Sequence, residues 1–90
     1  MESQDAVIRH SILDYLVRHP GAKDTMEGVI HWWIAKPCPA ERIAIETVED
    51  LVTRGWILKR ATSGHPIYSL NHAHLNEIRE FVSQNRTRIS

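Results

Sequence analysis

The chain has 90 residues, 42% hydrophobic and 24% charged, and this size predicts one compact domain rather than a multidomain enzyme. Its 11 basic and 11 acidic residues cancel to a formal net charge of zero, which argues against a histone-like or polybasic binder. Its single cysteine, Cys38, excludes an internal disulfide, and no stretch approaches the roughly 18 apolar residues of a membrane span. We therefore expect a soluble, cytoplasmic protein without a membrane segment.

The spacing of apolar residues predicts a first helix over residues 3–18, with Ser3 as its N-cap. A second helix is expected over residues 25–35. Asp24 and Glu27 have the spacing of an acidic capping box at its start.

A third helix is expected from Pro39 to Arg54, because the fixed backbone angle of proline suits the first helical position. Gly55 follows where a left-handed residue commonly ends a helix. The inward stripe of this helix is predicted to be Ala44, Ile45, Val48, Leu51 and Val52.

Two short strands are expected over residues 56–60 and 66–70, joined as a hairpin by a loop of small and polar residues. The last helix is expected over residues 73–84, capped by Asn71 or His72.

The segment from the third helix to the hairpin has a residue pattern that is found in a known superfamily. The residues that carry it are Thr47-Val48, Leu51, Arg54-Gly55-Trp56-Ile57, Ser63-Gly64 at the loop tip, and Tyr68-Ser69-Leu70. In this pattern the chain resembles the winged helix-turn-helix superfamily. The resemblance implies an α+β, mainly α fold: a three-helix bundle, a two-stranded β-hairpin wing and a C-terminal helix. We expect a single domain over residues 1–90, with an ordered core at about 5–84 and a flexible polar tail at 85–90.

The resemblance also implies a DNA-binding protein, a small transcriptional regulator whose third helix enters the major groove while the wing contacts the backbone. Candidate DNA contacts are Arg42 and Glu46 on the third helix, Lys59, Arg60 and His65 on the wing, and Arg86 and Arg88 in the tail.

The distribution of charge favours an alternative. Residues 39–54 carry four acidic and two basic residues, whereas residues 55–70 carry two cations and no acid. An acidic third helix would be repelled by DNA phosphates, so the alternative is a protein-interaction module, an adaptor or assembly factor.

Two aromatic residues are candidate protein contacts. Trp32 and Trp33 are adjacent, so on a helix their side chains point about 100° apart and cannot both face the core centre. Trp33 is the expected core residue, while Trp32 either packs at the edge of the core or anchors a partner. Phe81 belongs to a last helix whose apolar pattern suggests a homodimer contact.

No pattern in the sequence points to catalysis or to a metal. The six histidines and Cys38 lack the paired spacing of a zinc site. A glycine-rich phosphate loop and a nucleophile elbow are both missing from the sequence. We therefore expect no enzymatic activity, no metal and no cofactor.

Overall fold

The computed structural model describes residues 4–34 and 41–89, and it describes side chains for residues 5–34 and 41–84. The expected N-cap Ser3, the helix start at Pro39 and the single cysteine Cys38 lie outside these residues. Four α-helices and three strands follow one another along the chain, with a π-helical turn (Val29–Trp33) after α2 and a 3-10 turn (His72–His74) before α4. Their bounds are α1 Gln4–Arg18, β1 Lys23–Asp24, α2 Met26–Gly28, α3 Glu41–Thr53, β2 Ile57–Arg60, β3 Ile67–Leu70 and α4 Leu75–Ile89.

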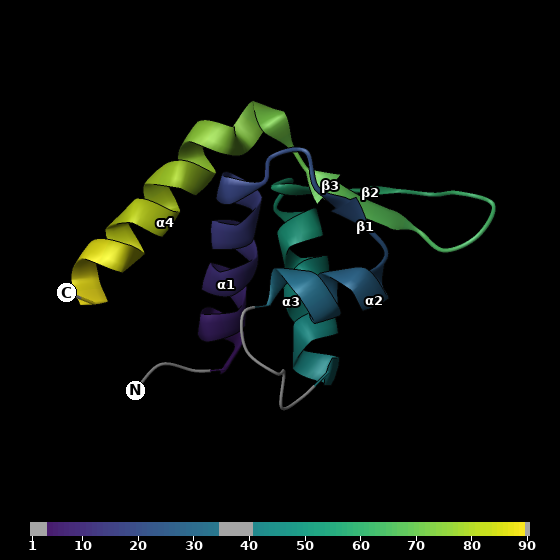
Figure 1. Cartoon of the computed structure of the whole chain (residues 1–90), viewed down its shortest axis with the longest axis horizontal. Helices are drawn as coiled ribbons and strands as arrows, with labels where there is room; N and C mark the ends of the chain where they lie inside the picture. The colour runs from purple at the N-terminus through teal and green to yellow at the C-terminus, as the bar shows by residue number, and fades with distance from the viewer. Residues whose placement is uncertain (1–3, 35–40, 90) are drawn as a thin grey trace.

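The three strands form one antiparallel sheet in the order β1-β3-β2. The expected hairpin is confirmed as β2 and β3, although each strand begins one residue later than predicted. The strand β1 was not predicted; it has only two residues and pairs Lys23 with Ser69 and Asp24 with Tyr68. The loop between β2 and β3 projects away from the helices, while α4 lies beside α1 on the opposite side of the molecule (Figure 1).

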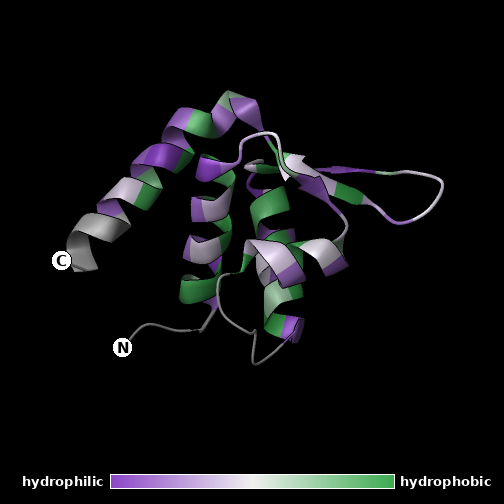
Figure 2. Ribbon diagram, viewed as in Figure 1, coloured by the Kyte–Doolittle hydropathy of each residue, from purple (hydrophilic) through white to green (hydrophobic). Residues whose placement is uncertain are grey.

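The hydrophobic core lies between the helices and one face of the sheet. In Figure 2, hydrophobic residues line the parts of α1 and α3 that lie inside the bundle. The buried apolar side chains come from all the main elements: Ile8, Ile12, Leu13, Leu16, Val29, Trp33, Ile34, Ala44, Val48, Leu51, Ile57, Tyr68, Leu70, Ile78 and Val82. The helices α1, α3 and α4, the π-helical turn and the strands β2 and β3 thus share one core, and α3 packs against both β2 and α1.

The start of the second helix differs from the prediction. Thr25, not Asp24, is the N-cap, because the Thr25 hydroxyl accepts a hydrogen bond from the Gly28 amide at 3.3 Å. Asp24 is held in the sheet by its pairing with Tyr68, and its carboxylate accepts from the Thr25 amide at 2.9 Å. The helix is also short: after Gly28 the chain widens into the π-helical turn.

The third helix ends as predicted. Gly55 has a φ of +84°, its amide donates to the Val52 carbonyl at 3.0 Å, and the Trp56 amide donates to the Leu51 carbonyl at 3.1 Å. These two bonds form a Schellman motif, which satisfies carbonyls at the helix end and turns the chain into β2.

The predicted inward stripe of α3 is wrong at one position. Ile45 is 36% exposed, and Thr47 takes the buried place, with its hydroxyl donating to the Ile43 carbonyl at 2.7 Å. The core-facing positions are Ala44, Thr47, Val48 and Leu51, at spacings of three and four residues. Ile45 is one residue off this stripe, and one residue rotates a side chain by about 100°.

The last helix also differs in its bounds. Asn71 caps the 3-10 turn, since its side chain accepts from the Ala73 amide at 3.1 Å and donates to the Gly55 carbonyl at 2.6 Å. The helix α4 then runs from Leu75 to Ile89, beyond the expected end at Gln84. Asn71 therefore links the start of this helix to the end of α3.

Candidate functional site

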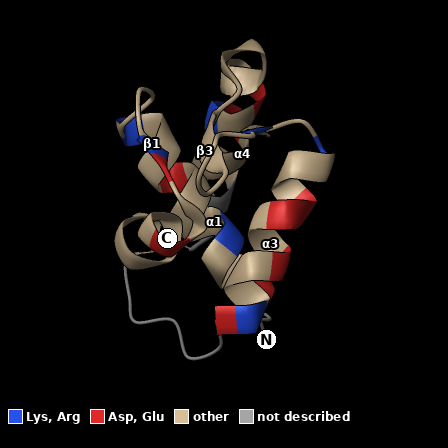
Figure 3. Ribbon diagram, turned by 90° about the vertical axis from the view of Figure 1, so that its right-hand side faces the viewer, with Lys and Arg blue, Asp and Glu red and all other residues tan. Residues whose placement is uncertain are grey.

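The exposed face of α3 is acidic, and its two arginines are paired within the helix. Arg42 Nε lies 3.8 Å from Glu46 Oε1, and Arg54 Nε lies 3.2 Å from Asp50 Oδ2. Figure 3 shows acidic residues at successive turns along α3. The predicted base contacts Arg42 and Glu46 thus lie together, as partners of one exposed ion pair. Neither arginine adds a free positive charge to this face.

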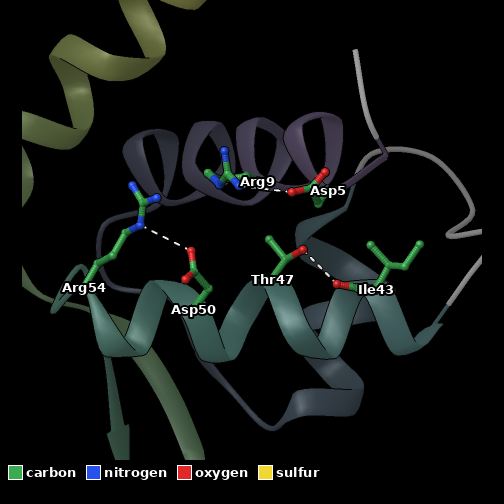
Figure 4. Close-up of polar contacts among 6 residues, drawn as sticks. All are labelled: Asp5, Arg9, Ile43, Thr47, Asp50 and Arg54. Carbon is green, nitrogen blue, oxygen red and sulfur yellow. Dashed lines mark hydrogen bonds and ion pairs between the residues drawn. The ribbon is translucent and has the colours of Figure 1, made fainter. Parts of the chain in front are cut away.

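A groove of about 640 Å³ lies between α1 and α3 (Figure 4). Its lining consists of Asp5, Arg9, Ile43, Glu46, Thr47, Asp50 and Arg54. Arg9 pairs with Asp5 at 3.3 Å across one turn of α1, just as Arg54 pairs with Asp50 on α3. The charged side chains of this groove thus form ion pairs within their own helices, although the buried Nε of Arg9 has no hydrogen-bond partner among the described residues.

Lys59 on β2 is bound to α3 through Glu49. Its Nζ lies 3.2 Å from Glu49 Oε2, and the Tyr68 hydroxyl donates to the same oxygen at 3.2 Å. The hydrogen bond to Glu49 raises the pKa of Lys59, and burial together with the Glu49 charge raises the pKa of Tyr68. Both groups therefore keep their protons more firmly than in water. The charge of Lys59 is compensated inside the protein.

Arg60 lies next to Lys59 on β2 and belongs to the other face of the sheet. Successive residues of a strand point to opposite faces, so Arg60 turns away from α3 while Lys59 turns toward it. Arg60 instead lines a cleft of about 240 Å³ on the outer face of the sheet, together with Lys23 of β1. The sequence placed Lys59 and Arg60 in one basic patch, and the structure separates them.

The outer-face cleft contains residues that the sequence did not single out. Lys23, Leu58 and His72 line it, and Leu58 is 48% exposed. Lys23 comes into the sheet only through β1, whose two residues carry no recognisable pattern. An exposed leucine next to two cations in the predicted strand was the one signal that could have indicated this face.

The other predicted DNA contacts are His65, Arg86 and Arg88. Among the described side chains they do not extend Lys59 and Arg60 into a continuous positive surface. His65 is exposed at the end of the wing loop, where its carbonyl accepts from the Thr62 hydroxyl at 2.7 Å. Arg86 and Arg88 lie in the last turns of α4, and their side chains are outside the described residues.

The two aromatic candidates have different surroundings. Trp32 is 67% exposed, whereas Trp33 is 2% exposed and stacks on Tyr15 with the ring centroids 5.8 Å apart. The expectation that only one of the two tryptophans enters the core is confirmed. Phe81 is half-buried, and its ring meets that of Trp56 edge-on at 5.7 Å. Phe81 therefore packs within the chain.

No group of His, Cys, Asp and Glu side chains suited to a metal ion occurs among the residues with described positions. Within the same residues, every helix is too short or too polar to cross a membrane. Comparison with known protein families finds no match, and comparisons with curated proteins and with solved structures find none either.

Proposed function

We propose that this chain is a winged-helix protein whose function is to bind another protein, with Trp32 as the anchor of the contact. The fold part of this proposal is supported by the element order: three helices, a hairpin and a last helix, with β1 between the first two helices. The projecting loop between β2 and β3 is the wing (Figure 1).

The exposure of Trp32 is the observation that carries the proposal. A tryptophan left 67% exposed leaves a large apolar surface in water, and tryptophan is the residue most enriched in the energetic centres of protein interfaces. The π-helical turn that presents it is rare in proteins and occurs frequently at functional sites. Folding of the chain itself uses the neighbouring Trp33.

The charge of α3 supports a protein partner over DNA. A helix that reads DNA needs cations that release counterions from the phosphates. Here Arg42 and Arg54 are engaged by carboxylates of the same helix, and Glu49 engages Lys59 of the wing. Carboxylates facing the duplex would weaken binding instead.

The test has two arms. In the first, proteins captured from an extract of the source cells by the wild-type chain are identified and purified, and their affinity is measured by calorimetry. Trp32→Ala should weaken the affinity by about 30-fold or more, while Val7→Ala, which shortens another exposed apolar side chain, should leave it unchanged. Equal effects of both substitutions would refute the role of Trp32.

In the second arm, a random-sequence duplex is titrated at about 50 and about 200 mM salt. Under the proposal, Arg42→Ala and Arg54→Ala do not change any residual binding, because α3 does not contact the duplex. If the affinity of either variant for the duplex depends less on salt than that of the wild type, α3 contacts the duplex, and this part of the proposal is overturned.

DNA binding through the wing is a second candidate function. It is favoured by one observation: residues 55–70 contain no acid, and Arg60 has no ion pair among the described residues. In the same titration, Arg60→Ala should then reduce the slope of log affinity against log salt concentration by about 1. Lys59→Ala should change this slope less, because Glu49 already compensates the charge of Lys59.

A further inference from the structure

We infer that the cleft on the outer face of the sheet is a docking site for an acidic peptide segment with apolar side chains between its carboxylates. This site is separate from Trp32 and does not depend on the function proposed above. It lies on the face of β1, β2 and β3 that turns away from the helical core.

The register of the sheet places the residues of this cleft. Lys23 pairs with Ser69, and Ser69 pairs with Leu58, so these three residues form one row across the three strands. Arg60 pairs with Ile67 in the next row on the same face. Since neighbouring strands are about 4.8 Å apart, the two outer strands that carry Lys23 and Arg60 are about 10 Å apart across the sheet.

Lys23 and Arg60, at the rim of the cleft, form no ion pair with any side chain that the structure describes. Among the eight Lys and Arg residues with described side chains, five form ion pairs: Arg9, Arg18, Arg42, Arg54 and Lys59. Lys23 and Arg60 are two of the remaining three, and both line this one cleft. None of the residues that line it is an Asp or a Glu. The cleft thus presents uncompensated positive charge, which is complementary to carboxylates.

The floor of the cleft is aliphatic. Leu58 and Ile67 form it on the outer face of the sheet, and Leu58 is 48% exposed. An apolar side chain resting on Leu58 and Ile67 would be removed from water, while acidic residues on both sides of it would reach Lys23 and Arg60. The combination of an aliphatic floor with a cationic rim fits a peptide that carries both kinds of side chain.

The same floor disfavours a nucleic acid as the occupant. Surfaces that bind single strands stack the bases on aromatic rings, and no Trp, Tyr or Phe lines this cleft. A phosphate alone would leave Leu58 and Ile67 uncovered. The acidic peptide is therefore the occupant that uses both features of the site.

The experiment is a titration of the ¹⁵N-labelled chain, followed by NMR, with a synthetic peptide in which glutamate alternates with leucine and valine. We expect chemical-shift changes at residues 20–24, 57–60 and 67–72, and none along α3. Two control peptides carry glutamine or lysine in place of glutamate, and each should bind about tenfold more weakly or not at all. Equal binding of the glutamine peptide, shifts confined to other surfaces, or no binding of the glutamate peptide would overturn the inference.

Variants of the chain test the same site. The double substitution Lys23→Glu with Arg60→Glu should weaken the glutamate peptide by about tenfold or more, and Leu58→Ser should weaken it severalfold. The matched control is Arg79→Glu, an exposed arginine of α4 outside the cleft, which should leave binding unchanged. Circular dichroism confirms that each variant is folded.

Two further measurements separate the alternatives. Trp32→Ala should not alter peptide binding, so a failure of the Trp32 proposal and a failure of this one are told apart. A single-stranded DNA oligonucleotide that binds the cleft more tightly than the peptide, and loses affinity in the Lys23→Glu, Arg60→Glu variant, would overturn the peptide assignment in favour of a nucleic acid.

Discussion

The ammonium group of Lys59 on β2 lies 3.2 Å from the carboxylate of Glu49 on α3. The same carboxylate oxygen accepts the hydroxyl of Tyr68 on β3, and the Lys59 ammonium stands 5.8 Å from the centroid of the Tyr68 ring. One acidic side chain thus connects both strands of the hairpin to α3.

Removing the Tyr68 hydroxyl should weaken this connection. Tyr68 is 3% exposed, so Tyr68→Phe keeps the packing of the ring and removes only the hydrogen bond to Glu49. We expect a loss of about 1 kcal/mol in the free energy of unfolding, measured by urea denaturation. Tyr15→Phe is the control, because the Tyr15 ring packs on Trp33 through its face. Equal losses in the two variants would contradict the role of the Tyr68 hydroxyl.

The same cluster should make stability fall at alkaline pH. The pKa values of Lys59 and Tyr68 are raised in the folded chain, so the folded state holds these protons more firmly than the unfolded state. Their contribution is complete below about pH 10 and decreases as the pH rises through the raised values. Urea denaturation from about pH 9 to about pH 11 measures this decrease.

The variant Glu49→Gln isolates the part of this pH dependence that depends on the carboxylate. Glutamine cannot supply the negative charge that holds the Lys59 proton, and burial alone remains to raise the pKa of Tyr68. The decrease in stability above about pH 10 should therefore be smaller than in the wild type. An identical decrease in both proteins would show that other groups cause it.

Gly55 should be more sensitive to substitution than Gly64. Its φ of +84° is unfavourable for a residue with a Cβ, so Gly55→Ala should cost about 1–2 kcal/mol of stability. Gly64→Ala is the control, since a Cβ there meets nothing within 4 Å and its φ is not positive. Thermal unfolding of the two variants checks the difference, and Gly55→Asn should recover part of the loss.

The elements that could be predicted are those with a local signal. The apolar spacing of α1 and α3, and Gly55 after α3, predicted helices and a helix end that the structure confirms. The strand β1 could not be predicted, because its two residues are extended only through pairing with β3. The cap at Thr25 was missed for the same reason, since the sheet holds Asp24.

The candidate sites depended more on tertiary contacts. Counting charges along the sequence indicated an acidic α3 and a basic wing. It could not show that Glu49 compensates Lys59, nor that strand alternation turns Arg60 toward Lys23 instead. Helical geometry predicted that only one of the two adjacent tryptophans faces the core. The surface on which Trp32 lies followed only from the fold.

The two adjacent tryptophans should differ sharply in their effect on stability. Trp32 is 67% exposed, so Trp32→Ala should change the free energy of unfolding by no more than about 0.5 kcal/mol. Trp33 is 2% exposed and stacks on Tyr15, so even the mild change Trp33→Phe removes buried contacts and should cost about 2 kcal/mol. Urea denaturation measures both variants.

Acrylamide quenching of tryptophan fluorescence gives a second readout, because the quencher reaches Trp32 in the folded chain. Quenching should decrease strongly in Trp32→Ala and little in Trp33→Phe. A large loss of stability in Trp32→Ala would mean that this side chain supports the fold, and it would remove the basis for treating Trp32 as a partner's anchor.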